Sequence, residues 1–319
     1  MKLSIVIVTR NTRDMLLKCL GSIADAIRSG LYEVIVVDNA SSDGTSEALK
    51  SAYPEVKQTR FDVNTGFARA SNKGASLAEC EILFFLNNDT IATEINIEIL
   101  LSAFDKNPQL GIVSPRLIGI DGKEQPAVAY LPTFSTVMSS SAKKCANVKL
   151  QSALDGKGNL AGVAYLCGAA LLIRREAFEE VGGFDERFFF YFEDADLCRQ
   201  ITDNGWGMQL VEDSLIIHLG GGSTRKISVG STVEMIRSRY QYMEKHYGRT
   251  KAVIVANLDF AIRLRRFLIS SVGVILTLGL CSGLRRKTCA HARVCLWFLG
   301  GMLPREAPLY KRLVCDWFS

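Results

Sequence analysis

The chain has 319 residues, of which 48% are hydrophobic; this composition supports a sizeable core and excludes an intrinsically disordered protein. Its formal net charge of +5 is unevenly distributed. Residues 225–319 contain 17 Lys and Arg against 5 Asp and Glu, whereas residues 1–224 contain 21 against 28. The acidic part favours polar chemistry or a bound cation, and the basic part favours an anionic partner. Because the basic part is also apolar, a membrane surface fits it better than a nucleic acid.

Two features of the sequence bear on the compartment. Nine cysteines are scattered without a Cys-x-x-Cys pair, which predicts reduced thiols in a cytosolic setting and no zinc site. The apolar start of the chain resembles a secretion signal, but polar residues return at Thr9, which leaves the apolar run too short for one. We therefore interpret residues 3–8 as a first β-strand.

Apolar runs alternate with helical patterns through residues 1–90. In chain order, we expect a strand at 3–8, a helix at 13–28, a strand at 33–37, helices at 45–51 and 68–78, and a strand at 82–86. Strands that alternate with helices predict βαβ units around a parallel sheet, where ligands bind beyond the carboxyl ends of the strands. Polar clusters follow three strands, at 9–11, 38–45 and 87–90, and indicate a ligand site at that edge.

The pattern changes in the second half of the chain. Residues 117–160 are rich in Gly, Pro, Ser and Lys, and we expect a long excursion over the sheet edge there. Order returns with an apolar run at 163–173 and a helix at 174–181. The tail contains an uncharged run of 18 residues, 267–284, with basic residues on both sides. This run is at the lower limit for a membrane span, and in-plane or re-entrant insertion and a buried helix are alternatives.

Three polar segments at this edge can contact a ligand. Asp38 ends a predicted strand, where it can accept hydrogen bonds from a nucleoside; the alternative is an Asx-turn or helix cap, which we favour for Asp43. Residues 64–74 predict a turn and a helix, and Gly66 allows close approach of a phosphate, although Asn-x-Gly is also a common turn. Asp89 follows another strand and can bind Mg²⁺ or Mn²⁺ between two phosphates, unless it caps the next helix.

The most distinctive segment is 182–198. Five consecutive aromatic residues, 188–192, precede Glu193 and Asp194, which suggests acids held against an apolar wall with pKa values raised toward those of a general base. The alternative is an acidic first turn that complements a helix dipole, and both hold together if one acid serves the helix while Asp194 faces the substrate. For His218, a structural role and a metal-ligand role are both open.

The chain resembles family 2 glycosyltransferases, most nearly the bacterial rhamnosyltransferase-like members that build cell-surface polysaccharide. The resemblance covers residues 1–223 and rests on six segments in order: SIVIVTRN, VVDNASSDGT, NTGFARASNKG, LNNDT, GGFDERFFFYFEDADLC and HLGGGS. It implies an α/β fold of the GT-A type, with a mixed, mostly parallel sheet flanked by helices. The nucleotide-binding half would span 1–90, the acceptor and metal half 91–224, and a helical, membrane-associated tail 225–319.

The resemblance also implies roles for individual residues. Asp194 corresponds to the catalytic base beside Glu193, and Asp89 to the last acid of the metal-binding Asp-x-Asp motif, whose first acid is Asn87 here. His218 resembles the later partner for Mg²⁺ or Mn²⁺. The predicted contacts are Thr9, Asn11, Asp38, Asn64, Gly66, Asn72 and Asn88 for the nucleotide sugar, and Tyr165, Gly168 and Trp206 for the acceptor. Tyr165 stands where the family commonly has Trp.

The implied activity is an inverting, metal-dependent transfer of a sugar, with dTDP-rhamnose as the leading donor, to a hydroxyl of a glycan or lipid-linked precursor. The tail would hold the enzyme at the cytoplasmic face of the plasma membrane. Two other classes stay open. A nucleotidyltransferase would usually show a Gly-rich basic loop after the first strand, which residues 9–12 are not, and a silent nucleotide-sugar-binding scaffold would not need Glu193 and Asp194. A dehydrogenase is disfavoured because no G-x-G-x-x-G follows a strand.

Overall fold

The structure is a computed structural model that describes residues 3–139, 160, 162, 164–220, 229–278 and 280–302. The chain divides into two compact units, Met1–Ser223 and Thr224–Ser319. The boundary predicted at residue 224, and the last residues of the segment HLGGGS, lie outside the described residues.

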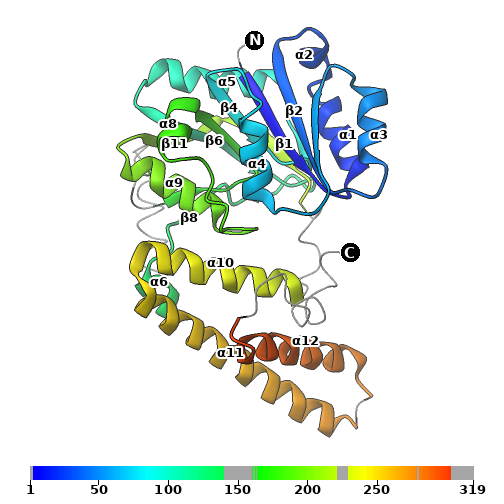
Figure 1. Ribbon diagram of the computed structural model, residues 1–319, viewed down its shortest axis with the longest axis vertical. Helices are drawn as coiled ribbons and strands as arrows, with labels where there is room; N and C mark the ends of the chain where they lie inside the picture. The colour runs from blue at the N-terminus through cyan, green and yellow to red at the C-terminus, as the bar shows by residue number, and fades with distance from the viewer. Residues whose placement is uncertain are drawn as a thin grey trace. The chain divides into compact units, whose positions relative to one another are not determined.

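The first unit is built around a nine-stranded sheet in the order β3-β2-β1-β4-β10-β6-β11-β5, with β7 paired to β6 (Figure 1). Its strands are β1 (Leu3–Thr9), β2 (Tyr32–Asn39), β3 (Lys57–Phe61), β4 (Ile82–Leu86), β5 (Thr90–Ile91), β6 (Leu110–Ile118), β7 (Glu124–Gln125), β10 (Ala170–Arg174) and β11 (Gly207–His218). Strands β1, β2, β3, β4, β6 and β11 run in one direction, and β5, β7 and β10 run against them. The predicted mixed α/β sheet is confirmed. Two further strands, β8 (Val128–Tyr130) and β9 (Ala164–Leu166), form a separate antiparallel pair.

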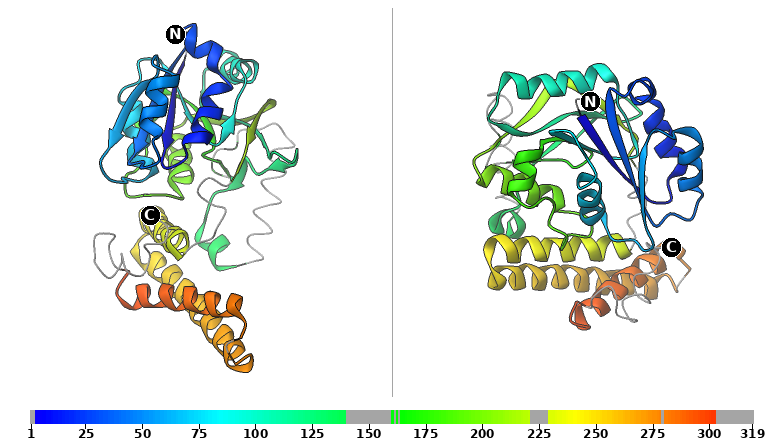
Figure 2. Two further views of the ribbon diagram at one scale, coloured as in Figure 1. Left: turned by 90° about the vertical axis from the view of Figure 1, so that its right-hand side faces the viewer. Right: turned by 45° about the horizontal axis from the view of Figure 1, so that its top comes forward.

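Helices cover both faces of the sheet (Figure 2). One face carries α1 (Arg13–Gly21), α2 (Ala24–Arg28), α3 (Thr45–Ala52) and α5 (Glu94–Lys106). The other carries α4 (Phe67–Ala75), α8 (Arg175–Glu180) and α9 (Glu193–Asp203). A short helix, α6 (Phe134–Met138), follows β8.

Alternation along the strands divides the core into two layers. In β4, Phe84 and Leu86 join the cluster beneath α1 and α5, whereas Leu83 and Phe85 join the cluster beneath α4 and α8. Successive side chains of a strand point to opposite faces, so a strand covered on both sides must be apolar throughout. Because β1 pairs in parallel with both β2 and β4, the carboxyl ends of these three strands meet at one edge of the sheet, where their polar clusters follow.

Several elements differ from the prediction. The single helix expected at 13–28 is two helices, since Ile23, between them, has φ −126° and ψ 22°. The sequence pattern missed β3 (Lys57–Phe61), which lies at the edge of the sheet and is never fully buried. The excursion expected at 117–160 contains β7, β8 and α6, and its residues 140–159 lie outside the described part.

The second unit contains three packed helices, α10 (Val229–Tyr247), α11 (Arg249–Leu276) and α12 (Ser282–Leu299). Trp297 is fully buried against residues of α10 that include Val233 and Ile236. Arg239 of α10 forms an ion pair with Asp259 of α11. The tail is therefore helical, as predicted.

The uncharged run at 267–284 is not one helix. Helix α11 ends at Leu276, Leu278 has a φ of +49°, and α12 begins at Ser282. Within the part of the chain that the structure describes, no helix is both long and apolar enough to cross a membrane. The break explains this result, because it divides the run between two helices.

Candidate functional site

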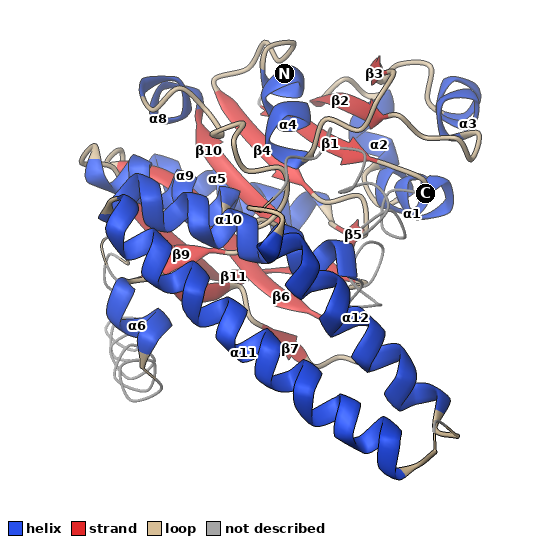
Figure 3. Ribbon diagram, turned by 60° about the horizontal axis from the view of Figure 1, so that its bottom comes forward, coloured by secondary structure: helices blue, strands red, loops and turns tan. Residues whose placement is uncertain are grey.

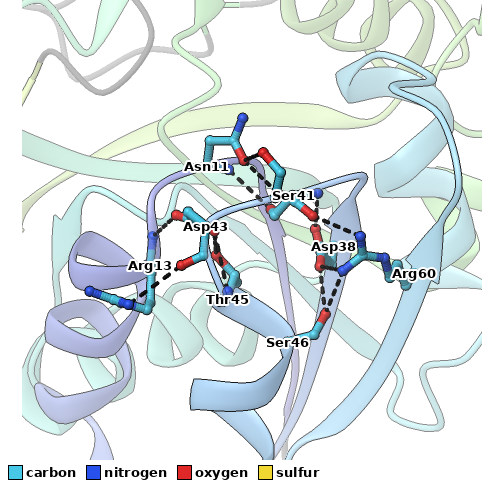
Figure 4. A network of polar contacts seen from close by, with 9 residues as sticks. Asn11, Arg13, Asp38, Ser41, Asp43, Thr45, Ser46 and Arg60 are labelled. Atoms are coloured by element: carbon cyan, nitrogen blue, oxygen red, sulfur yellow. Dashed lines mark hydrogen bonds and ion pairs between the residues drawn. The ribbon is translucent and has the colours of Figure 1, made fainter. Parts of the chain in front are cut away.

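The loop after β2 is organised around Asp38, which is fully buried (Figure 4). Its Oδ1 accepts a hydrogen bond from the backbone N–H of Ser41 at 2.8 Å, and its Oδ2 accepts one from Ser46 Oγ at 2.6 Å. Arg60 Nη1 lies 3.0 Å from the same Oδ2, and Arg60 Nη2 donates to the carbonyl of Ser41 at 2.7 Å. Both oxygens of Asp38 are thus occupied by protein donors that hold the loop, and its contact with a nucleoside stays a prediction.

Asn11 joins the loop after β1 to the loop after β2 (Figure 4). Its backbone N–H donates to Ser41 Oγ at 3.0 Å, and its Oδ1 accepts from the N–H of Ser42 at 2.7 Å. The residue has a φ of +52°, a left-handed conformation that Asn tolerates better than most residues. Asp43 serves the first turn of α3 as expected, since its Oδ1 accepts from the N–H of Thr45 at 3.2 Å. The two loops therefore form one bonded rim with Asn11 exposed on it.

Asn39, which the sequence analysis missed, holds the turn before α4. Its Nδ2 donates to Asn64 Oδ1 and to the carbonyl of Gly66, both at 3.0 Å, and its Oδ1 accepts from the N–H of Thr65 at 2.8 Å. Gly66 has a φ of +87°, and a Cβ added there would lie 2.6 Å from the carbonyl oxygen of Phe189. Asn64 and Gly66 thus shape a turn against which the aromatic segment packs.

Asn72 connects α4 to the segment that leads to the acids. Its Nδ2 donates to the carbonyl of Phe184 at 2.8 Å, and its Oδ1 accepts from the N–H of Phe184 at 2.9 Å. Asn72 therefore positions this segment, and its contact with the donor stays a prediction. The neighbouring Arg69 lies 3.8 Å from Glu186 of the same segment.

Asn88 and Thr9 lie together where β4 and β1 end. Asn88 Nδ2 donates to Thr9 Oγ1 at 3.0 Å and to Thr12 Oγ1 at 2.6 Å. The two threonine hydroxyls are 3.1 Å apart. This cluster joins the first and third polar segments, as expected for neighbouring parallel strands.

Asp89 and His218 face each other across the end of the sheet. His218 Nε2 lies 3.4 Å from Asp89 Oδ1. On the other side of the ring, Nδ1 lies 2.7 Å from Gln125 Oε1, whose amide is oriented because Gln125 Nε2 donates to the carbonyl of His218 at 3.0 Å. The ring of His218 is therefore held with Nδ1 toward Gln125 and Nε2 toward Asp89. A hydrogen bond of this kind orients a histidine for metal binding.

The residues present fit a divalent cation that a second molecule also coordinates. No group of three or more His, Cys, Asp or Glu side chains that could hold a metal ion occurs in the described ranges. Mg²⁺ and Mn²⁺ need fewer protein ligands when phosphate oxygens supply the rest. Adjacent ligands on an octahedral cation lie about 3 Å apart, close to the separation of Asp89 Oδ1 and His218 Nε2. The donor set therefore suits a cation that arrives with a phosphate ligand.

Asp194 and Glu193 form a buried acid pair at the start of α9. Asp194 accepts hydrogen bonds from the N–H of Gly168 at 3.0 Å and of Ala195 at 2.8 Å. Glu193 is 8% exposed, and its Oε2 has no hydrogen-bond partner within the described part of the chain. Burial and then the charge of Asp194 raise the pKa of Glu193 to about 8. Burial also raises the pKa of Asp194, while the N–H groups of Gly168 and Ala195 act in the opposite direction.

The pair shares its charge unequally. Two N–H donors from Gly168 and Ala195 stabilise an ionised Asp194, whereas no group of the described residues donates a hydrogen bond to Glu193 Oε2. The proton that the pair retains at neutral pH therefore belongs on Glu193, and Asp194 is the carboxylate. The acids occupy the first turn of α9 and the pKa of each is raised, which is compatible with both interpretations of the acidic segment; that Asp194 faces a substrate stays a prediction.

The backbone before the acids adopts an uncommon conformation. Tyr191 and Phe192 have φ values of +73° and +70°, which cost free energy in residues with large side chains. The segment is held by buried Phe188 and by the carbonyl of Phe189, which accepts from the N–H of Phe67 at 2.7 Å. Strained residues persist where surrounding contacts impose their conformation. Here the two strained residues immediately precede α9, and they set the position of Glu193 and Asp194 in its first turn.

The predicted acceptor residues lie in two places. Gly168 contacts Asp194, and Tyr165 is close enough that burial and then the charge of Asp194 raise the pKa of its hydroxyl. The N–H of Asn87 donates to the carbonyl of Ala169 at 2.9 Å, so the same segment connects the acids to the end of β4. Trp206 lies beyond the other end of α9, where its Nε1 donates to Glu180 at 2.8 Å. The structure does not bring Trp206 to the acid pair.

The chain is similar in sequence and in fold to known proteins. N-Acetylglucosaminyl-diphospho-decaprenol L-rhamnosyltransferase of Mycobacterium tuberculosis is 28% identical over 285 residues, covering 83% of this chain and 92% of that protein. The mannosyltransferase PcManGT of Pyrobaculum calidifontis, solved with GDP-Man and Mn²⁺, is similar in fold, with a TM-score of 0.53, 17% identity, and coverage of 93% of this chain and 87% of that one. TarS 1–349 of S. aureus in complex with UDP has a TM-score of 0.52, 14% identity, and coverage of 94% and 92%. The family model for glycosyl transferase family 2 matches residues 4–182, more than half of the chain, and the protein therefore belongs to that family.

Proposed function

We propose that the protein transfers a sugar from a nucleoside diphosphate to an acceptor hydroxyl with inversion, and that Asp194 is the general base. The observation that carries this proposal is the asymmetry of the acid pair: Asp194 accepts two backbone N–H groups, while Glu193 is buried with an unpartnered oxygen. A neutral Glu193 leaves Asp194 as a single buried carboxylate. Its raised pKa makes it a better proton acceptor than an exposed aspartate.

In the proposed reaction, Asp194 removes the proton of the acceptor hydroxyl while that oxygen attacks the anomeric carbon. Attack comes from the face opposite the nucleotide, so the bond to the diphosphate breaks and the configuration inverts. Asp89 and His218 would hold Mg²⁺ or Mn²⁺, which when bound neutralises negative charge on the diphosphate. The rim formed by Asn11 and the cluster of Thr9 and Asn88 would orient the donor.

We propose rhamnose as the transferred sugar, from a dTDP or UDP carrier, and a lipid-linked diphosphate sugar as the acceptor. The relative from Mycobacterium tuberculosis, named as a rhamnosyltransferase of a decaprenol-linked substrate, supports both choices. The acceptor would place the reaction at the cytoplasmic face of the plasma membrane.

Replacing Asp194 with Asn tests the role of the base. The amide keeps the shape of the side chain but cannot accept the proton, so transfer should fall by about 10²–10⁴-fold while nucleotide-sugar binding survives. Asp203→Asn is the matched control, because Asp203 lies at the other end of α9 and its side chain is 65% exposed. Transfer by Asp194→Asn at the rate of the control would remove Asp194 from the mechanism.

A further inference from the structure

Helices α11 and α12 form a hairpin (Figure 3), and large apolar side chains are exposed at its end. The apolar tip comprises exposed residues that belong to the end of α11 and the turn after it: Leu268, Ile269, Val272, Ile275, Leu276, Leu278 and Leu280. Four of these residues are largely exposed to solvent: Ile275 by 71%, Leu276 by 78%, Leu278 by 86% and Leu280 by 84%. An exposed cluster of large apolar side chains marks a surface that meets another molecule or a membrane.

The two helices are packed together, so the exposure is a property of a formed element. A Cβ added at Gly273 would lie 2.7 Å from Leu284 Cδ2, which shows that α12 approaches α11 closely near the tip. Further along, the rings of Phe260 and Phe298 are 5.5 Å apart. Ser270, on the side of α11 opposite Val272, is buried. The hairpin thus has an inner face, which is buried between its two helices, and an outer face, on which apolar side chains are exposed.

Cations surround the base of the tip. The basic collar comprises three arginines of α11 and three cations of α12: Arg263, Arg265, Arg266, Arg285, Arg286 and Lys287. Burial and the charges of Arg263, Arg266 and Lys287 lower the pKa of His291, so cations from both helices act at one point. The sequence has no Asp or Glu between Asp259 and Glu306. The surface around the tip is therefore complementary to an anionic partner.

The uncharged stretch is longer on α11 than on α12. Along α11, the residues between Arg266 and the end at Leu276 rise about 15 Å at roughly 1.5 Å per residue. Along α12, the first cation of the collar, Arg285, follows Ser282 within one turn. The cations of α12 therefore lie nearer the end of the hairpin, and they limit insertion to a shallow depth in one leaflet.

We propose that the apolar tip inserts into one leaflet of an anionic membrane, with the basic collar on the lipid phosphates. Insertion removes the exposed apolar side chains from water, and the long side chains of the collar reach the headgroups from both helices. The inference does not depend on sugar transfer, because vesicle binding requires neither donor nor acceptor.

Co-sedimentation of the full chain with vesicles tests the proposal. The protein should bind vesicles of phosphatidylcholine mixed with phosphatidylglycerol more tightly than vesicles of phosphatidylcholine alone. High salt should release it only in part, because the apolar contribution is not screened. Ile275→Glu should weaken binding about tenfold or more, since a charge is then carried into hydrocarbon. Ile95→Glu is the matched control, because Ile95 is 70% exposed on α5 of the other unit.

A variant of the basic collar tests the electrostatic part of the proposal without changing the apolar tip. Replacing Arg285, Arg286 and Lys287 with Gln should weaken the preference for anionic vesicles, because it removes three of the six cations while the tip remains apolar. Equal binding by Ile275→Glu and Ile95→Glu would overturn the proposal, as would a wild-type chain that stays in the supernatant. A tip that instead joins two copies would appear as a dimer in vesicle-free solution that Ile275→Glu converts to a monomer, and this result would also overturn it.

Discussion

Replacing Glu193 with Gln should stabilise the folded protein in alkaline solution. Glu193 is 8% exposed, its Oε2 has no hydrogen-bond partner, and burial beside Asp194 raises its pKa from 4.5 to about 8. The folded chain therefore retains a proton that the unfolded chain has lost. Between these two pKa values the free energy of unfolding falls as the pH rises, because the folded state binds more protons.

The magnitude follows from the displacement of the pKa. The stabilising proton is fully in place below pH 4.5 and is lost as the pH passes about 8. At about 1.4 kcal/mol per pKa unit, the free energy of unfolding changes by roughly 3–5 kcal/mol across this window. Gln has no charge to bury, so the variant should lose this pH dependence and exceed the wild type in stability by a similar amount above the window.

Urea unfolding followed by circular dichroism, on both sides of the window, measures the difference. Glu176→Gln, an exposed substitution on α8, controls for the loss of one negative charge. The reasoning is refuted if the wild type and Glu193→Gln lose stability equally as the pH rises. Glu193→Gln should also retain transfer, because a neutral amide replaces a neutral acid, whereas Asp194→Asn should not.

Three further outcomes are expected. Gly66→Ala should lower stability by about 1–3 kcal/mol in thermal unfolding, because it adds a contact with Phe189 to a strained φ; Gly122→Ala, with a φ of +75° and open space around it, isolates the contact. Gln125→Leu should weaken Mn²⁺-supported nucleotide binding in calorimetry about 10–100-fold, and an unchanged affinity would argue against His218 as a ligand. Transfer should stop in EDTA and return with Mn²⁺ or Mg²⁺, whereas full activity in chelator would exclude a required cation.

Two central strands were predictable because burial on both faces demands continuous apolar runs, as in residues 33–37 and 82–86. The equally central β6 (Leu110–Ile118) was missed. Strand β3 (Lys57–Phe61) was not predictable, since it lies at the sheet edge and its side chains stay partly exposed. The break after Leu276 was also missed. An uncharged run gives no sign of where one helix ends and the next begins, and tertiary contacts such as that between Gly273 and Leu284 decide it.

The acid pair was predictable because five aromatic residues beside two acids is a local pattern. The partners that define the rest of the site are distant in sequence. Arg60 lies 22 residues from Asp38, and Gln125 lies 93 residues from His218. Long-range hydrogen bonds of this kind leave no periodicity in the chain, and they decide whether a polar side chain faces a ligand or the protein.

The bonds of Asn72 have a consequence for the order of folding. Its side-chain amide nitrogen and oxygen both form hydrogen bonds with the backbone of Phe184, which lies 112 residues later in the chain. Closing a loop of that length costs conformational entropy before any contact compensates, so such contacts form late. During synthesis, the first half of the sheet can pair its strands long before Phe184 leaves the ribosome. Helix α4 should therefore gain this contact only when the segment that carries Glu193 and Asp194 folds onto it, so that an incomplete chain lacks the arrangement around the acid pair.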